Sequence, residues 1–219
     1  MIKVINNGAD VKKISGKYKD VRKKYGISKK TIMLSYAASL TRPHLKGQFY
    51  LIDMMKEIME AGIDAKLVIA GDGEIRKEME QMSRRRGVDK NIIFAGDIDY
   101  VPDLLRSSDI FVFVSLKEGM PLAVVEAMAA GLPVAAFRAP GVADIVKGGR
   151  TGMLARAGDV KGIAKAVIKL AKDKKLRKKF GTAGKKLAFN NFSIKKTVSA
   201  YTGLYRKCAE EYSRKGEKK

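Results

Sequence analysis

Short apolar runs alternate with helix-like segments along most of this chain. Runs typical of buried parallel strands occur at Thr31–Tyr36, Lys66–Ala70, Asn91–Gly96, Ile110–Val114 and Pro133–Phe137. Apolar residues spaced three to four apart predict an amphipathic helix over Gln48–Ala61, and further helices are expected over Glu74–Arg86 and Val101–Ser107. This alternation predicts an α/β fold, a Rossmann-like parallel sheet of about six strands with helices on both faces.

The length of 219 residues suits one well-packed core, so a single domain is expected. We divide the chain into three segments. Residues 1–30 form a linker with a basic helix over Gly16–Lys30, residues 31–192 form the Rossmann-like domain, and residues 193–219 form a C-terminal helix with a basic tail. Helices are expected from Asp159 onwards, and Ile163, Val167 and Leu170 share one face of the first.

The stretch from Lys117 to Val134 reads as a loop, a short helix and the start of a strand. Pro121 falls where a first helical residue tolerates a missing N–H and a fixed φ. The amides around Met120, Leu122 and Ala123 would then be unpaired at a helix N-terminus. Together with the helix dipole, they predict a site for a phosphate group.

Two glutamates accompany this helix start. Glu126 lies five residues after Pro121, about 7 Å along the axis, and its side chain tilts back towards the N-terminus. A carboxylate suits a vicinal diol because it accepts two hydroxyl hydrogens, and Glu118 could serve a second sugar ring. One anion and two polyols describe a nucleotide-sugar. Two glutamates eight residues apart also arise by chance, but Glu126 lies in a largely apolar helix, where an unpaired charge would be costly to bury.

The residues around these glutamates resemble the retaining glycosyltransferases of the GT-B fold grouped as family 4 (glycosyl transferases group 1), whose donor site carries an E-x7-E motif. That motif runs here from Glu118 to Glu126, within Ser115–Pro121 and Glu126–Val134, and the resemblance extends from Asn6 to about Phe192. It implies that this chain is the C-terminal, donor-binding half of a GT-B fold, with a further strand near Thr151. The acceptor-binding N-terminal domain, or a partner subunit in its place, is then missing.

The resemblance also implies roles for single residues. Lys46, and with less support Arg42, would hold the donor's diphosphate; the family's arginine usually stands one or two positions earlier relative to the lysine. Glu118 would contact the sugar and Glu126 the ribose, and the backbone near Ile98 would contact the base. The donor would also meet the helix start, formed by Gly119, Met120, Pro121, Leu122 and Ala123. Asp72, in a Gly-Asp-Gly turn, is expected to contact the ligand or to cap a helix.

No metal or other cofactor is expected beside the nucleotide-sugar substrate. One histidine, His44, and one cysteine, Cys208, do not suffice for a His/Cys metal cluster. We expect His44 in an exposed loop and Cys208 as a structural thiol in a reducing compartment. The Asp-x-Asp triplet at Asp97 is interpreted as a coincidence, because it follows a strand in a GT-B pattern.

The net charge of +22 is large for a chain of this length. It indicates either an anionic partner or a lineage that favours lysine on protein surfaces. Residues 161–219 carry 19 basic and 4 acidic side chains. An anionic membrane surface and a solvated Lys-rich surface both remain open. Nucleic acid is disfavoured, since no nucleic-acid-binding motif or interleaved aromatic residues occur. The chain has no apolar run of about 20 residues and no signal peptide at Met1, so we expect it in the cytoplasm, at most peripheral to the inner membrane face.

These observations and the resemblance imply transfer of a hexose from a UDP- or GDP-sugar to a hydroxyl group with retention, building a glycolipid or a polysaccharide. A different class stays open: a non-catalytic module that binds a nucleotide-sugar, or one half of a split glycosyltransferase.

Overall fold

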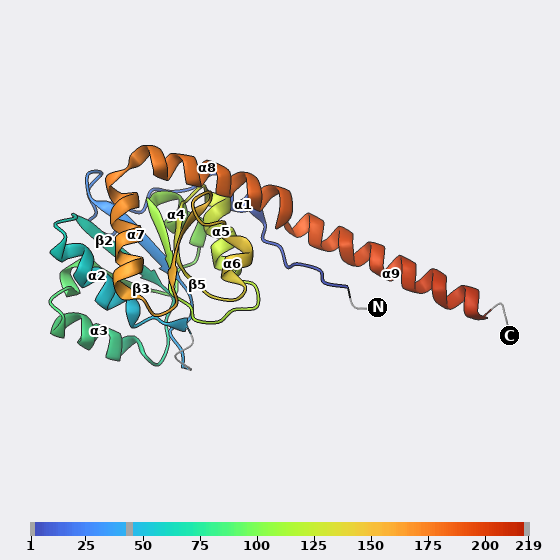
Figure 1. The fold of residues 1–219 in the computed structure, drawn as a ribbon, viewed down its shortest axis with the longest axis horizontal. Helices are drawn as coiled ribbons and strands as arrows, with labels where there is room; N and C mark the ends of the chain where they lie inside the picture. The colour runs from blue at the N-terminus through green and yellow to red at the C-terminus, as the bar shows by residue number, and fades with distance from the viewer. Residues whose placement is uncertain (1–2, 43–45, 217–219) are drawn as a thin grey trace.

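A six-stranded, all-parallel sheet forms the centre of the protein (Figure 1), as the computed structural model of residues 3–42 and 46–216 shows. Its order is β3-β2-β1-β4-β5-β6. The strands are β1 (Ile32–Ala37), β2 (Ala65–Ala70), β3 (Ile92–Gly96), β4 (Ile110–Phe113), β5 (Val134–Arg138) and β6 (Gly152–Arg156). The sequence-based prediction of a Rossmann-like sheet is confirmed.

Helices cover both faces of the sheet, again as predicted. The helices are α1 (Val11–Ser15), α2 (Tyr50–Glu60), α3 (Arg76–Arg85), α4 (Val101–Ser107), α5 (Leu122–Ala130), α6 (Val142–Ile145), α7 (Val160–Lys172), α8 (Lys174–Asn191) and α9 (Ile194–Gly216), with a 3-10 turn at Asp89–Asn91. One layer holds α2, α3 and α7; the other holds α1, α4, α5 and α8, with α6 beside α5. The predicted loop residue His44 lies outside the described residues.

The central strands are buried on both faces, which explains their continuous apolar sequences. Every residue of β4 is buried, and its neighbour β1 pairs with it through Leu34 opposite Ile110. The aromatic rings of Phe111, Phe113 and Tyr36 stack in a row, with centroids 6.2 and 6.4 Å apart. The core therefore centres on β1 and β4.

The predicted basic helix over Gly16–Lys30 is wrong. The structure has a shorter and earlier helix, α1, followed by turns up to β1. Arg22 explains the difference, because its guanidinium donates to the carbonyls of Ser107 and Thr31 and to the Asp109 carboxylate. These bonds hold the segment as a loop against the end of α4 and the start of β1. The loop takes the place of the predicted helix.

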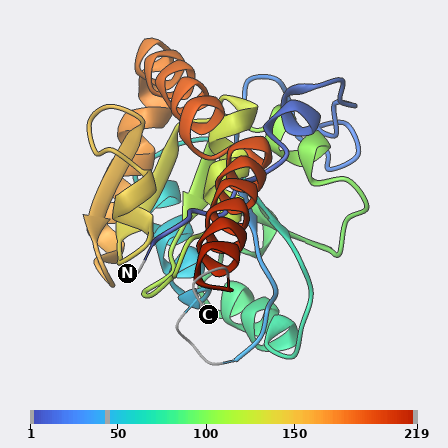
Figure 2. The same cartoon turned by 90° about the vertical axis from the view of Figure 1, so that its right-hand side faces the viewer.

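The last helix, α9, extends away from the body of the protein (Figures 1 and 2). Its exposed apolar residues follow a spacing of three, four or seven residues along one side: Ile194, Val198, Tyr201, Tyr205 and Tyr212. No helix among the described residues is long and apolar enough to cross a membrane.

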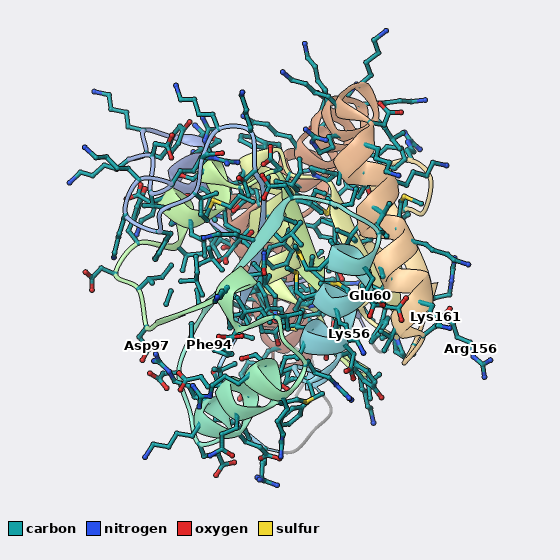
Figure 3. All side chains as sticks on the ribbon, turned by 90° about the vertical axis from the view of Figure 1, so that its left-hand side faces the viewer. Lys56, Glu60, Phe94, Asp97, Arg156 and Lys161 are labelled. Atoms are coloured by element: carbon teal, nitrogen blue, oxygen red, sulfur yellow. The ribbon has the colours of Figure 1, made fainter. Side chains whose placement is uncertain are left out.

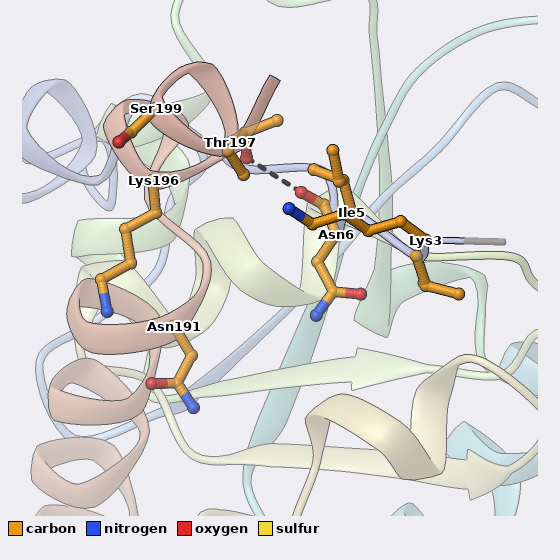
Figure 4. Close-up of a pocket in the computed structure, with 9 residues that line it drawn as sticks. Lys3, Ile5, Asn6, Asn191, Lys196, Thr197 and Ser199 are labelled. Carbon is orange, nitrogen blue, oxygen red and sulfur yellow. Dashed lines mark hydrogen bonds between the residues drawn. The ribbon is translucent and has the colours of Figure 1, made fainter. Parts of the chain in front are cut away.

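The N-terminal segment lies against the start of α9. Ala9 bridges Ser193, and the Thr197 hydroxyl donates to the Asn6 carbonyl at 2.9 Å (Figure 4). A Cβ on Gly8 would lie 2.6 Å from the Ser193 carbonyl carbon, so only glycine allows this approach. An open pocket of about 390 Å³ lies between the two segments. The N-terminal segment thus fixes where α9 leaves the domain.

We expect Arg22→Ala to lower the free energy of unfolding by about 2–4 kcal/mol, because three partly buried acceptors, the Ser107 and Thr31 carbonyls and the Asp109 carboxylate, lose a charged donor. Urea denaturation at neutral pH measures this. A matched control is Arg86→Ala, whose half-exposed pair with Asp53 is worth about 0–1 kcal/mol. Equal losses in the two variants would contradict the structural role of Arg22.

Candidate functional site

A crevice opens at the carboxyl ends of the central strands. The chain leaves β1 towards β2 and β3 but leaves β4 towards β5 and β6, so β1 and β4 mark the point where the strand order reverses. Open α/β sheets bind ligands at such a point. A pocket of about 410 Å³ lies there, lined by Ala37, Ala38, Ala70, Gly71, Asp97, Ile98, Val101, Ala123 and Glu126.

Glycines let the loops at this edge approach one another. A Cβ on Gly71 would lie 2.2 Å from the Ala38 carbonyl oxygen, and a Cβ on Gly73 would lie 2.2 Å from that of Leu40. Both glycines have positive φ values, which other residues rarely adopt. The glycines of the predicted turn therefore hold the loops after β1 and β2 together and shape the pocket wall.

The α5 helix begins beside the pocket with free backbone donors. Pro121 is the N-cap, with an extended ψ of 99°, so the prediction that it is the first helical residue is wrong by one position. Its carbonyl accepts from the amides of Val124 and Val125. The amides of Leu122 and Ala123 have no acceptor among the residues that the structure describes. They remain available for an anion, as the sequence indicates.

Glu126 forms part of the pocket wall, about one turn after Ala123. No hydrogen bond or ion pair reaches its carboxylate from the described part of the chain. Burial raises the pKa of the Glu126 carboxyl above its ordinary value. A partly buried acceptor group without a donor can accept two hydroxyl hydrogens of a ligand, as a ribose would provide.

Glu118 and Lys46 meet across the two loops that follow β4 and β1. Lys46 Nζ lies 2.7 Å from Glu118 Oε1, and the Glu118 side chain is only 12% exposed. Two glycines fix these loops: a Cβ on Gly47 would lie 2.1 Å from the Val114 carbonyl oxygen, and one on Gly141 would lie 2.5 Å from that of Glu118. The structure therefore brings together two predicted site residues that are 72 positions apart.

Tyr36 lies beneath this ion pair. Its hydroxyl is buried and has no hydrogen-bond partner in the part of the chain that the structure describes. Burial raises the pKa of the Tyr36 hydroxyl, and the nearby negative charge of Glu118 raises it further. Both effects favour the neutral form of Tyr36.

The two remaining polar candidates have protein partners. Arg42 forms an ion pair with Glu78 of α3 at 2.9 Å, and both side chains are about half exposed. Asp72 accepts from the Gly73 amide and from Arg76, and these bonds lower the pKa of its carboxyl. The helix that follows is capped by Ile75, so the N-cap alternative for Asp72 is wrong. The diphosphate role of Arg42 and the ligand role of Asp72 stay predictions.

Ile98 lines the pocket, and its contact with the base stays a prediction; several of its neighbours in the pocket were not predicted. These are Ala37, Ala38, Asp97 and Val101. The paired alanines at the end of β1 are the sequence signal for this wall, because small residues at a strand end leave room for a ligand.

Gly119, another predicted site residue, lies where an added Cβ would meet no described atom within 4 Å. Within the described ranges, no group of three or more His, Cys, Asp or Glu side chains could hold a metal ion.

The fold is a Rossmann-like α/β domain with a crevice at the point where the strand order reverses, and comparison with known proteins gives its family. The family described as "Glycosyl transferases group 1" matches residues 17–187. The chain belongs to this family.

Among the relatives is the N-acetyl-alpha-D-glucosaminyl L-malate synthase of Bacillus anthracis, 30% identical over 84% of this chain and 48% of its own. The structure of Anabaena HepE in complex with UDP matches with a TM-score of 0.86 at 23% identity, over 94% of this chain and 57% of that one. The C-terminal domain of a group 1 glycosyl transferase, LpcC of Francisella tularensis, matches with a TM-score of 0.73 at 27% identity, over 85% of this chain and 100% of that domain. The chain spans about half the length of the curated relatives it matches.

We expect Glu126→Gln to raise the melting temperature at pH 7. The pKa of Glu126 is higher in the folded than in the unfolded state, so its charged form opposes folding. This penalty grows as the pH rises through the unfolded-state pKa and is absent below it. The gain should therefore shrink as the pH is lowered towards 4. Glu60→Gln, on an exposed position of α2, is the control and should change little. An equal gain at both pH values would contradict the assignment.

Proposed function

We propose that this domain binds the nucleotide-sugar donor of a retaining hexosyltransferase, a member of family 4, which transfers a hexose from a UDP- or GDP-sugar to a hydroxyl group of a glycolipid or polysaccharide. One observation carries the proposal: the Glu126 carboxylate and the Leu122 and Ala123 amides, which have no partner within the described ranges, lie on one helix start at the crevice. A diol acceptor next to an anion site matches the ribose and phosphates of a nucleotide.

Each part of the donor has a proposed partner. The base lies near Ile98, the ribose hydroxyls donate to Glu126, and the Leu122 and Ala123 amides donate to the diphosphate. Lys46 shares the diphosphate, and Glu118 binds the sugar hydroxyls. The pairing of Lys46 with Glu118 keeps both charges neutralised before the donor arrives. When the glycosidic bond breaks, Lys46 and the amides would stabilise the charge on the departing diphosphate.

Known relatives support this proposal. HepE structures contain UDP and UDP-glucose, and a 30% identical Escherichia coli relative is named a UDP-Gal-dependent alpha-1,3-galactosyltransferase. Both are about twice as long as the aligned segment. We therefore propose that an acceptor-binding domain, on the same protein or on a partner subunit, completes the enzyme. The exposed apolar side of α9, which includes Tyr201 and Tyr205, is the surface we assign to that contact.

The alternative function is a non-catalytic nucleotide-sugar-binding module, or half of a split enzyme. This alternative requires only the crevice that the described residues form. To distinguish the two functions, a UDP-sugar or GDP-sugar is incubated with the chain and the products are analysed by chromatography. Release of free nucleoside diphosphate, lost in Glu118→Gln, supports an enzyme. An intact donor together with measurable donor binding supports the module.

We expect wild type to bind UDP or GDP in calorimetry and Lys46→Met to weaken this binding about tenfold, because one charge-assisted contact to phosphate is lost. Affinity for the matching nucleoside, which has no phosphate, should stay unchanged. Glu126→Gln should weaken both about 10–100-fold, because the ribose loses its charged acceptor. Glu60→Ala is the control on a distant helix. The absence of binding by wild type to any of these ligands would refute the proposed function.

A further inference from the structure

The basic charge of this protein gathers on its last helices. In the α7–α8 segment, residues 160–191, 11 side chains are basic and one, Asp173, is acidic. That carboxylate accepts from the Leu176 amide as the N-cap of α8. Within the ranges that the structure describes, none of the ion pairs includes a side chain of α7 or α8. The charge of these helices is therefore available to an external partner.

The packing of α8 directs its lysines outwards. Its buried side is made of small residues and Phe180, and it rests on the end of α5: a Cβ on Gly181 would lie 2.0 Å from the Gly131 carbonyl oxygen. On the opposite side, Lys175, Lys179 and Lys186 follow each other at helical spacing and are exposed. Figure 3 shows nitrogen-ended side chains spreading into solvent from the orange helices at the top.

Arg177 differs from these lysines in its role. Its guanidinium donates to the carbonyls of Leu170 and Ala171, each at 2.7 Å, and so caps the end of α7. The α8 basic face, which we define as Lys174, Lys175, Lys178, Lys179 and Lys186, has no such internal task. These five exposed lysines lie on one helix and form a surface whose charges are all positive.

A pocket adjoins the α8 basic face and suits a phosphate group. It has a volume of about 310 Å³ and lies between α8 and the loop before β6, lined by Lys147, Arg150, Thr151, Ala183, Lys186, Leu187, Asn190 and Asn191. Lys147 is held by the Asp144 carbonyl at 2.8 Å. Arg150 and Lys186 are exposed cations, whereas Leu187 and Ala183 form an apolar part of the pocket wall. This mixture matches a phosphodiester attached to a glycerol backbone.

The α8 basic face and the donor crevice lie at opposite edges of the sheet. The α5 helix starts at the crevice, at the carboxyl ends of the strands, and ends at Gly131 just before β5. Since α8 packs at this far end, its lysines belong to the amino edge. A flat partner bound there leaves the crevice open.

We propose that the α8 basic face binds the surface of an anionic lipid bilayer, with the adjoining pocket holding a lipid phosphate. Charge complementarity selects this partner, since basic residues near an anionic leaflet are attracted to it without a groove or a sequence-specific contact. The proposal is independent of the donor site and goes beyond the proposed function.

The test is co-sedimentation of the full chain with vesicles. Wild type should bind vesicles of equimolar phosphatidylcholine and phosphatidylglycerol, should not bind phosphatidylcholine alone, and should be released by about 0.5 M NaCl, where screening is strong. Replacing Lys175, Lys178, Lys179 and Lys186 with Gln should lower the partition coefficient on the order of a hundredfold or more. Arg150→Gln, in the pocket alone, should lower it about fivefold.

The control removes the same charge elsewhere. Lys56, Lys77, Arg156 and Lys161 are exposed, and Figure 3 labels three of them well below α8. Their replacement with Gln should have a much smaller effect than the α8 set. Equal losses in both sets, no binding to anionic vesicles, or binding that ignores salt would overturn the proposal, as would binding of single-stranded RNA but not vesicles. Calorimetry with UDP and GDP on the same variants shows that the donor site is intact.

Discussion

The pairing of β1 with β4 is the constraint on which the rest of the structure depends. The two strands are parallel neighbours, yet their connections leave towards opposite sides of the sheet. The loops that follow β1 and β4 therefore diverge and open the crevice, while the two strands stay paired. The same divergence carries Lys46 and Glu118 to one place, although one follows β1 and the other follows β4. Asp109 secures the start of the pair by accepting from the Met33 amide and Arg22.

Glycines turn this divergence into a defined site. Gly47 and Gly141 press their backbones against the ends of neighbouring segments, at distances that no side chain would allow. The loops are thus held rigidly, whereas the Glu126 carboxylate and the Leu122 and Ala123 amides have no partner among the described residues. An unpaired carboxylate such as Glu126 opposes folding, so its presence is better explained by a ligand than by stability. Rigid loops and unsatisfied groups together are typical of a binding site.

The sequence predicts the strands better than the segment before them. Continuous apolar runs define β1 to β5 within one or two residues, because burial on both faces leaves few other residue types. The segment over Gly16–Lys30 has a helix-like composition, but Arg22 holds it in turns through contacts with residues about 85 positions away. A local pattern does not contain such contacts. The ion pair of Arg42 with Glu78 was unpredictable for the same reason, since it joins a loop to α3 only after folding.

The placement of the α8 basic face and the crevice at opposite edges of the sheet also separates the two proposed binding functions electrostatically. Strands of five or six residues set the two edges of the sheet roughly 17–20 Å apart. This exceeds the Debye length of about 8 Å at physiological ionic strength, so exposed lysines at the amino edge contribute little to the potential at the start of α5. The charge that we propose to attract a bilayer is therefore screened from the proposed donor crevice. The proposed phosphate binding there would depend on local donors, which are the Leu122 and Ala123 amides and Lys46, and not on the net charge of the chain.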